Sequence, residues 1–163
     1  MIVLRLLDLI RPFSVPTGGM TPAVSPGDHV VMEGLTFLAR KPCRGDIVVF
    51  RTDGMADLPP KTIFVKRVAG QPGDRLRLAD GKLFINDQQV SLSNSTGEIV
   101  YRLPSGPPYA TTEATVPDGC YFVLGDNSTN SFDSRFWGSV PRENIIGRMC
   151  LCYWPPKRMG IVE

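Results

Sequence analysis

Residues 62–74 read Thr-Ile-Phe-Val-Lys-Arg-Val-Ala-Gly-Gln-Pro-Gly-Asp, an apolar run of strand-forming residues that ends in a Pro-Gly turn. Alternate side chains of a strand point to opposite faces, so Lys66 shares a face with Phe64 and Val68. Arg67 lies on the other face. If the Lys66 face is buried, desolvation lowers the lysine pKa and makes the amine usable as a general base near neutral pH. The alternative is an edge-strand lysine whose stem carries its charge out to water.

The same pattern, a short apolar run followed by Gly-Asp or Asp-Gly, recurs from residue 27 onward. Such runs are typical of antiparallel strands joined by turns, and nothing after residue 15 has a convincing helical period. The sequence therefore predicts an all-β, mainly antiparallel fold of two packed sheets. The predicted strands are 29–33, 46–51, 62–69, 75–78, 82–85, 120–124 and 145–154.

A peripheral hairpin is predicted at Asp80-Gly81, because a type I′ turn needs positive φ at both central residues. Residues 87–118 are richer in Ser, Thr, Gly and Pro, with a weak strand signal only at 98–103. We interpret residues 75–118 as an excursion from the main sheets and not as a linker between domains.

Composition excludes several classes of protein. A chain of 163 residues fits one domain, and 18 Lys and Arg against 16 Asp and Glu leave a net charge of +2. Neither a disordered polyelectrolyte nor a nucleic-acid binder built on bulk charge fits these numbers. The single histidine, His29, makes a His-rich metal site implausible and allows a Ser-His-Asp triad only if His29 is the base.

The cysteines, Cys43, Cys120, Cys150 and Cys152, form no C-x-x-C pair, so zinc-ribbon and thioredoxin-like readings fail on spacing. Cys150 and Cys152 would share one face of a strand, with Cα atoms near the upper limit for a disulfide. We expect these two to be buried thiols, and the pairing of the four cysteines stays open.

Residues 1–14 are interpreted as a short apolar N-terminal segment preceding a domain over 15–163. The first ten residues include Arg5 and Asp8, and as a helix they would rise only about 15 Å, half of a hydrocarbon core of about 30 Å. A surface-seeking helix, the remnant of a longer anchor and a helix docked on the domain are the open readings.

Two other segments are dense in functional groups. Residues 15–24, followed by Pro-Gly-Asp, form a turn-rich stretch that can present backbone N–H groups to a substrate or be an ordinary loop. Residues 125–138 offer Asp126, Asp133 and Arg135 as a buried ion network and Ser131 as a hydroxyl donor and acceptor. A calcium loop is disfavoured there, because the terminal Glu and the spacing of an EF-hand are missing.

In this order the three segments resemble the type I signal peptidases, membrane-anchored serine proteases that use a Ser/Lys dyad. Residues 15–22, Val-Pro-Thr-Gly-Gly-Met-Thr-Pro, are similar to the family's nucleophile box, Pro-Ser-x-Ser-Met-x-Pro, and residues 64–74 to its lysine box. Leu-Gly-Asp-Asn at 124–127 and Ser-x-Asp-Ser-Arg-x-Trp-Gly at 131–138 resemble its last box. The resemblance runs from about residue 12 to 154 and disfavours the self-cleaving repressors, which usually carry a DNA-binding segment.

The resemblance implies roles for individual residues. Lys66 would be the general base, Ser131 the hydroxyl that orients it, and Thr17 with the N–H of residue 19 the oxyanion hole. The peptide groove would include Met20, Pro22 and Phe64. Structural support would come from Arg67, Asp126, Asp133 and Arg135, with Arg67 paired to Asp126.

The resemblance also implies partners and location. The partners would be signal peptides of preproteins, cleaved after small residues, with the domain at the membrane on the extracytoplasmic (periplasmic) side. No metal or cofactor is implied, and no nucleic acid.

The departure from the family pattern is Gly19, which stands where the serine nucleophile should be. Four explanations are open: an engineered replacement, a natural paralogue that binds without cutting, Thr17 as a displaced nucleophile, and a water activated by Lys66. The Thr17 reading needs a backbone shift of several ångströms, because two residues of extended chain cover about 6.6 Å. Yet a protein that had abandoned hydrolysis would not need a buried lysine base.

We therefore expect a domain of signal peptidase type that is inactive or impaired in this copy. The alternatives are a non-catalytic peptide-binding protein on the same fold, a protease that uses Thr17, and a membrane-surface protein that works through residues 1–13.

Overall fold

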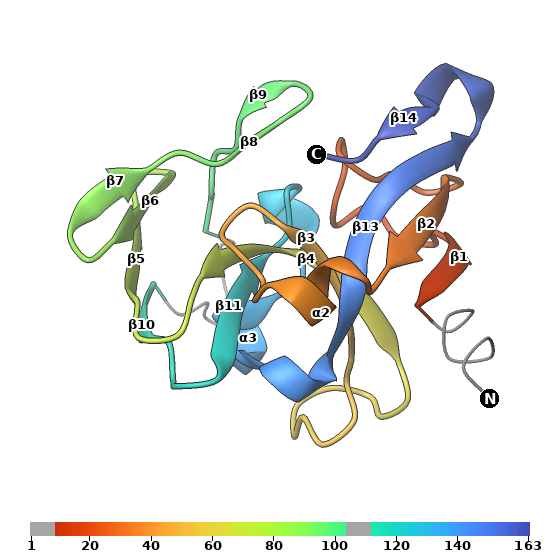
Figure 1. Cartoon of the computed structure of the whole chain (residues 1–163). Helices are drawn as coiled ribbons and strands as arrows, with labels where there is room; N and C mark the ends of the chain where they lie inside the picture. The colour runs from red at the N-terminus through yellow and green to blue at the C-terminus, as the bar shows by residue number, and fades with distance from the viewer. Residues whose placement is uncertain (1–8, 104–111) are drawn as a thin grey trace.

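The computed structural model describes residues 9–103 and 112–163. Within them the largest sheet has eight strands, and all its strand pairs are antiparallel (Figure 1). Seven strands follow the order β1 (Ile10–Ser14), β2 (His29–Glu33), β13 (Ile145–Trp154), β3 (Ile47–Arg51), β4 (Ile63–Gly70), β11 (Cys120–Leu124) and β12 (Val140–Pro141), while β14 (Gly160–Ile161) pairs with β13.

Smaller sheets form the excursion, which projects to the left of the main sheet in Figure 1. Asp80 and Gly81 have φ values of 52° and 78°, so the predicted type I′ geometry at this turn is confirmed. The excursion contains a four-stranded sheet and a two-stranded ribbon, built from β10 (Glu113–Thr115), β5 (Arg75–Ala79), β6 (Lys82–Ile85), β7 (Gln88–Val90), β8 (Ser93–Asn94) and β9 (Gly97–Glu98).

Helices in the described ranges are short. There are two α-helices of four residues and three 3₁₀ helices of three residues, in accord with the lack of helical periodicity in the sequence. None of the described helices is long and apolar enough to cross a membrane. They are α2 (Thr36–Ala39), α3 (Ser134–Trp137), η1 (Ser128–Asn130), η2 (Arg142–Asn144) and η3 (Pro156–Arg158).

The core explains why β3 is apolar at successive positions. Residues 47–50 are all buried. Ile47 and Val49 belong to one hydrophobic cluster, and Val48 and Phe50 to another. Because alternate residues point to opposite faces, β3 is covered on both sides and needs an unbroken apolar run. The all-β, mainly antiparallel prediction is confirmed, with the two-stranded ribbon as an additional sheet.

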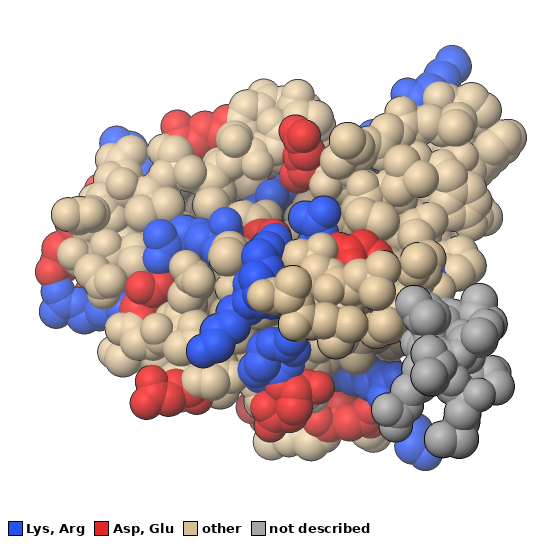
Figure 2. All heavy atoms as spheres, in the orientation of Figure 1, with Lys and Arg blue, Asp and Glu red and all other residues tan. Residues whose placement is uncertain are grey.

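Surface charge is mixed in sign. Lys and Arg side chains form a band across the face shown in Figure 2, with acidic side chains beside them. Several peripheral arginines are paired with carboxylates, among them Arg40 with Asp46 and Arg148 with Glu33. Exposed pairs of this kind contribute little to stability individually. The stability of the fold therefore depends mainly on the buried residues.

For residues 10–14 the structure differs from the predicted apolar helical segment over residues 1–14. Ile10–Ser14 is strand β1, paired with β2 from Ile10 opposite Glu33 to Ser14 opposite His29. Pro12 within it lacks an N–H, which an edge strand tolerates. The helix and anchor readings therefore do not hold for residues 10–14, and residues 1–8 lie outside the described residues.

The cysteine prediction is correct for one residue and wrong for the other. All four cysteines lie in the described ranges and are free thiols. Cys152 is buried, but Cys150 is only half-buried. The register of β13 against β2 shifts between Met149 and Leu151 and again between Cys152 and Trp154. These irregularities break the simple alternation on which the prediction depended.

Gly147 provides a test of the packing between β13 and β2. A Cβ at Gly147 would lie 2.6 Å from the Glu33 carbonyl oxygen and 2.8 Å from the Met32 sulfur, whereas one at Gly18 meets nothing closer than 3.5 Å. We expect Gly147→Ala to lower the free energy of unfolding by about 1–3 kcal/mol, because the strand must move. Gly18→Ala should stay within about 0.5 kcal/mol of the unmodified chain. Urea unfolding measures both, and equal stabilities would contradict the β13 register.

Candidate active site

The segment that carries Gly19 is a closed loop between neighbouring strands. We call residues 15–28 the Gly19 loop. The Val15 N–H donates to the Asp28 carbonyl at 2.9 Å, and the Gly27 N–H donates to the Val15 carbonyl at 3.0 Å. Because β1 and β2 pair beside this base, the loop leaves and re-enters the sheet at one place. Gly19 is buried in the loop, while Thr17 is exposed.

Lys66 lies on β4 and is buried, with 8% of its surface exposed. Its ammonium donates to the Val65 carbonyl at 3.1 Å and lies 5.5 Å from the centre of the Phe64 ring. No described carboxylate forms an ion pair with it. The expectation that the Lys66 face is buried is confirmed, and the solvated edge-strand alternative is wrong because β4 lies inside the sheet between β3 and β11.

Burial determines the charge state of Lys66. Desolvation lowers its pKa below the ordinary value of 10.5. The Asp133 carboxylate acts in the opposite direction, the Arg135 charge adds to the lowering, and the more weakly acting Asp126 again opposes it. The amine is therefore easier to deprotonate than that of an exposed lysine, which is what a general base requires.

Two buried carboxylates near Lys66 are each held by an arginine. Arg67 Nε and Nη2 donate to the two oxygens of Asp126, both at 2.8 Å. Arg135 Nε and Nη2 donate to the two oxygens of Asp133 at 2.8 and 2.9 Å, and both side chains are fully buried. The predicted partnership of Arg67 and Asp126 is confirmed. Since both carboxylates are already paired, Lys66 has no carboxylate of its own.

Asp133 and Arg135 also shape the loop that follows β11. Asp133 Oδ2 accepts from the Gly125 N–H at 2.9 Å, and Arg135 Nη2 donates to the Ser128 carbonyl at 2.8 Å. Arg135 Nη1 reaches the Arg102 carbonyl at 2.9 Å, which ties the loop to the excursion. The pair therefore cross-links the backbone around Ser131.

Ser131 and Lys66 both lie close to the Cβ position of Gly19, and the orienting role of Ser131 stays a prediction. Its hydroxyl is buried and has no hydrogen-bond partner in the described part of the chain. A Cβ at Gly125 would lie 2.0 Å from this hydroxyl oxygen and 2.5 Å from the Gly19 carbonyl oxygen, so position 125 admits only glycine. This close approach brings the Gly19 loop and the loop after β11 together.

The position of Gly19 relative to Lys66 is the most informative feature of the site. A Cβ on Gly19 would lie 3.5 Å from Lys66 Nζ, 3.4 Å from the Asn130 carbonyl oxygen and 3.7 Å from Ser131 Cα. These are ordinary contacts or close to it, and Gly19 does not have the left-handed backbone that only glycine accepts readily. A small side chain at residue 19 therefore fits and lies directly beside the lysine amine.

A cavity of about 520 Å³ opens in front of these groups. Its lining comes from the first part of the Gly19 loop and from the Lys66 strand, together with Asn130, Phe132 and Met149. Thr17, Met20 and Phe64 line it as expected. Pro22 does not; it is half-buried, and its carbonyl accepts a hydrogen bond from Arg158 at 2.8 Å, so its assignment to the peptide groove is corrected.

Asn127 contacts the Gly19 loop, although the sequence analysis assigned it no individual role. Its N–H donates to the Gly19 carbonyl and its Nδ2 to the Gly18 carbonyl, each at 3.1 Å. Asn127 therefore holds both glycines of the loop from the opposite wall. The only available signal was its place directly after Gly125-Asp126.

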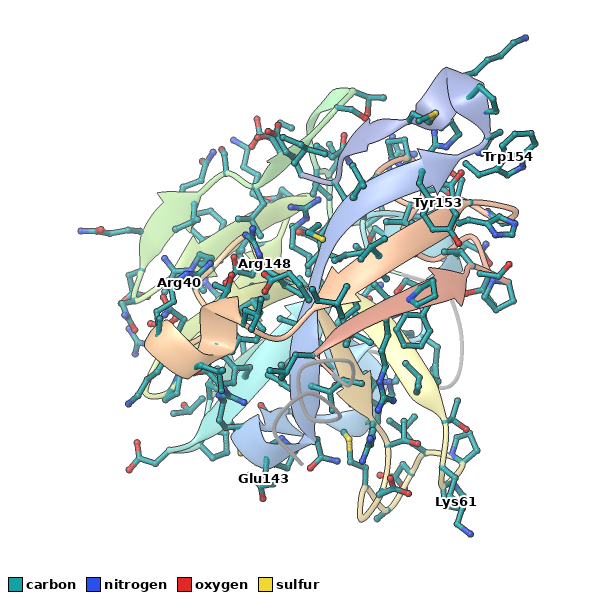
Figure 3. All side chains as sticks on the ribbon, turned by 45° about the vertical axis from the view of Figure 1, so that its right-hand side comes forward. Arg40, Lys61, Glu143, Arg148, Tyr153 and Trp154 are labelled. Carbon is teal, nitrogen blue, oxygen red and sulfur yellow. The ribbon has the colours of Figure 1, made fainter. Side chains whose placement is uncertain are left out.

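His29 lies outside the candidate site. Its ring packs edge-on against Tyr153 with centroids 5.8 Å apart, and it does not line the cavity. Figure 3 shows Tyr153 and Trp154 toward the same end of β13, with Lys61 projecting away elsewhere. The Ser-His-Asp alternative thus has no support in the geometry.

The site thus consists of a buried lysine close to a cavity of about 520 Å³, and comparison with known proteins gives the family. Residues 1–154 match the family model described as signal peptidase, peptidase S26. The chain belongs to this signal peptidase family.

Individual relatives agree with this membership. A probable signal peptidase I-2 of Synechocystis is 35% identical over 91% of this chain and 65% of its own length. A signal peptidase I of Leptolyngbya laminosa is 36% identical over 90% of this chain and 70% of its own. The chain thus spans slightly less than two thirds of the first of these relatives. The crystal structure of a signal peptidase I from Enterococcus faecalis V583 aligns at 29% identity over 67% of this chain and 97% of its own, with a TM-score of 0.49.

The charge state of Lys66 predicts how stability varies with pH. Because the folded-state pKa is below the unfolded value, the unfolded chain binds more protons between the two values, and stability rises with pH through that window. We expect Lys66→Met to stabilise the protein at pH 7, with a gain that shrinks as the pH approaches the ordinary value of 10.5.

Denaturant titrations between pH 7 and pH 10 measure this difference. The control is Lys61→Met, because Lys61 is exposed and points away from the fold (Figure 3). It should show no comparable pH-dependent gain. A constant difference between Lys66→Met and the unmodified chain would contradict a lowered pKa.

Proposed function

We propose that this chain binds the small-residue end of a signal peptide of an exported protein in the 520 Å³ cavity, and does not cut it by the serine route. The observation that carries the proposal is the 3.5 Å between Lys66 Nζ and the Cβ position of Gly19. A hydroxyl-bearing side chain at residue 19 would lie next to the Lys66 amine that could activate it, but Gly19 has no side chain. We further propose that the domain works at the extracytoplasmic surface of a membrane, where signal peptides emerge.

The lining of the cavity supports a peptide ligand. Its lining includes the apolar side chains of Met20, Phe64 and Phe132 and the first residues of the Gly19 loop. The Gly19 N–H donates to no described residue, so it can serve an incoming carbonyl oxygen. An extended peptide in such a groove would use backbone hydrogen bonds for affinity and shallow pockets for small side chains.

Other hydroxyls are poorly placed to replace the missing one. Ser131 Oγ is buried and does not line the cavity, so a scissile bond in the cavity cannot reach it. Thr17 does line the cavity, but the amine of Lys66 donates to Val65 and not to Thr17. A route through Thr17 therefore requires the Gly19 loop to move.

The proposed chemistry returns when residue 19 carries a hydroxyl. The neutral Lys66 amine takes the hydroxyl proton as the oxygen attacks the scissile carbonyl, and the residue 19 N–H and the Thr17 hydroxyl stabilise the oxyanion. The lysine ammonium then passes this proton to the leaving amine. Water, deprotonated by the same lysine, releases the acyl group.

Turnover of a fluorogenic Ala-x-Ala signal-peptide substrate in detergent tests the proposal. Loss of the serine in a serine protease costs about 10⁶-fold in kcat, so we expect Gly19→Ser to cut at least about 10³-fold faster than the unmodified chain. The unmodified chain and Gly19→Ala should bind the substrate without cutting it. Gly19→Ser combined with Lys66→Ala should be inactive.

Each other outcome has a defined meaning. Cutting by the unmodified chain that is lost in Thr17→Val assigns the nucleophile to Thr17, and cutting that survives this change points to a lysine-activated water. If Gly19→Ser binds the substrate and does not cut it, Lys66 does not activate a hydroxyl at residue 19, and the proposed chemistry is wrong. If no variant binds the substrate, the proposed peptide site is wrong.

A further inference from the structure

The second half of the Gly19 loop is organised by a buried carboxylate that the site described above does not use. Asp28 has 1% of its surface exposed. Its Oδ2 accepts from the Ser25 N–H at 2.8 Å, and its own N–H donates to the Ser25 carbonyl at 3.0 Å. Asp28 therefore folds the end of the loop into a tight turn before β2 begins.

Arg158 neutralises this carboxylate from a distant part of the chain. It is the last residue of η3, in the connection between β13 and β14. Its Nε donates to Asp28 Oδ1 at 2.7 Å and its Nη2 to Asp28 Oδ2 at 2.9 Å. The same Nη2 donates to the Pro22 carbonyl at 2.8 Å. One guanidinium thus binds the Gly19 loop at two separate points.

These two points belong to the same part of the loop as two residues that form a wall of the cavity. Met20 and Val24 line the cavity, are buried, and are joined by a hydrogen bond from the Val24 N–H to the Met20 carbonyl at 3.0 Å. Pro22 sits between them in the chain. Arg158 does not line the cavity, so it can affect a ligand only through the loop.

We propose that Arg158 is a positioning residue that fixes this wall through Pro22 and Asp28 and so sets the affinity of the cavity for a peptide. The inference rests on the proposed peptide-binding function and makes η3 part of the binding apparatus. The planar fork of arginine matters, because a lysine ammonium cannot make the paired contacts to Asp28 and also reach Pro22 in the same geometry.

Binding of an Ala-x-Ala signal peptide to the chain with its native Gly19, measured by calorimetry in detergent, is the first test. Arg158→Met removes the charge-assisted contacts to the loop and should raise the Kd for the peptide about tenfold. The Kd of Arg158→Lys should lie between that of Arg158→Met and that of the unmodified chain. The matched control is Arg148→Met. Arg148 is also paired with a carboxylate and is similarly exposed, 38% against 36% for Arg158. Figure 3 places it far along β13 from the Trp154 end, and its Kd should not change.

Hydrogen exchange separates positioning from general loss of stability. The Thr21 and Val24 amides donate within the loop, so their exchange should accelerate in Arg158→Met and Arg158→Lys and not in Arg148→Met. Circular dichroism at the assay temperature measures the folded fraction of each variant. If Arg158→Met does not fold, Arg158→Lys decides the question with the same two readouts.

The possible failures are distinguishable. Absence of peptide binding by the unmodified chain overturns the proposed function, and exchange in the loop then decides whether Arg158 positions it. Unchanged exchange in folded Arg158 variants overturns the inference. Faster exchange with an unchanged Kd overturns it too, since the loop would move without consequence for the ligand.

Discussion

Two buried bidentate carboxylate–arginine pairs balance the charge that acts on Lys66, and the rest of the site depends on them. Asp126 is neutralised by Arg67, and Asp133 by Arg135. Both carboxylates act to raise the pKa of Lys66, and without its arginine either one would do so more strongly. With both carboxylates paired, burial dominates the lysine pKa and lowers it. The two arginines thus leave Lys66 without a carboxylate partner among the described residues.

The same region requires backbones to approach closely. Gly125 has no room for a Cβ, because Ser131 and the Gly19 carbonyl occupy that space. Asn127 binds the carbonyls of Gly18 and Gly19 in the gap that remains. Gly19 is different: a side chain fits there and would touch the lysine amine. The glycine at 125 is therefore demanded by packing, whereas packing does not demand the glycine at 19.

Short apolar runs that end in turn residues were enough to predict several strands of the main sheet. β2, β4 and β11 are apolar, β-branched runs with turn residues after them, and they were predicted to within a residue or two. β1 was missed because it is short, contains Pro12 and follows an apolar stretch that suggests a helix. The half-buried Cys150 was missed because irregularities in β13 cannot be read from alternation.

The site divides in the same way. Lys66 could be identified from its strand and Gly19 from its box, because both belong to contiguous motifs. The contacts of Asn127 with Gly18 and of Arg158 with Asp28 join residues 109 and 130 positions apart, and no local pattern encodes them. Such contacts are visible only once the sheet has brought the ends of the chain together.

Burial makes the Lys66 amine easier to deprotonate, and the amine faces residue 19, a glycine with no hydroxyl to activate. Titration of the lysine side-chain resonances by NMR, with the Lys66 signal assigned from its loss in Lys66→Met, tests this most directly. The structure requires Lys66 to titrate below the ordinary lysine value of 10.5 and separately from the exposed lysines. Titration at that ordinary value would contradict the account.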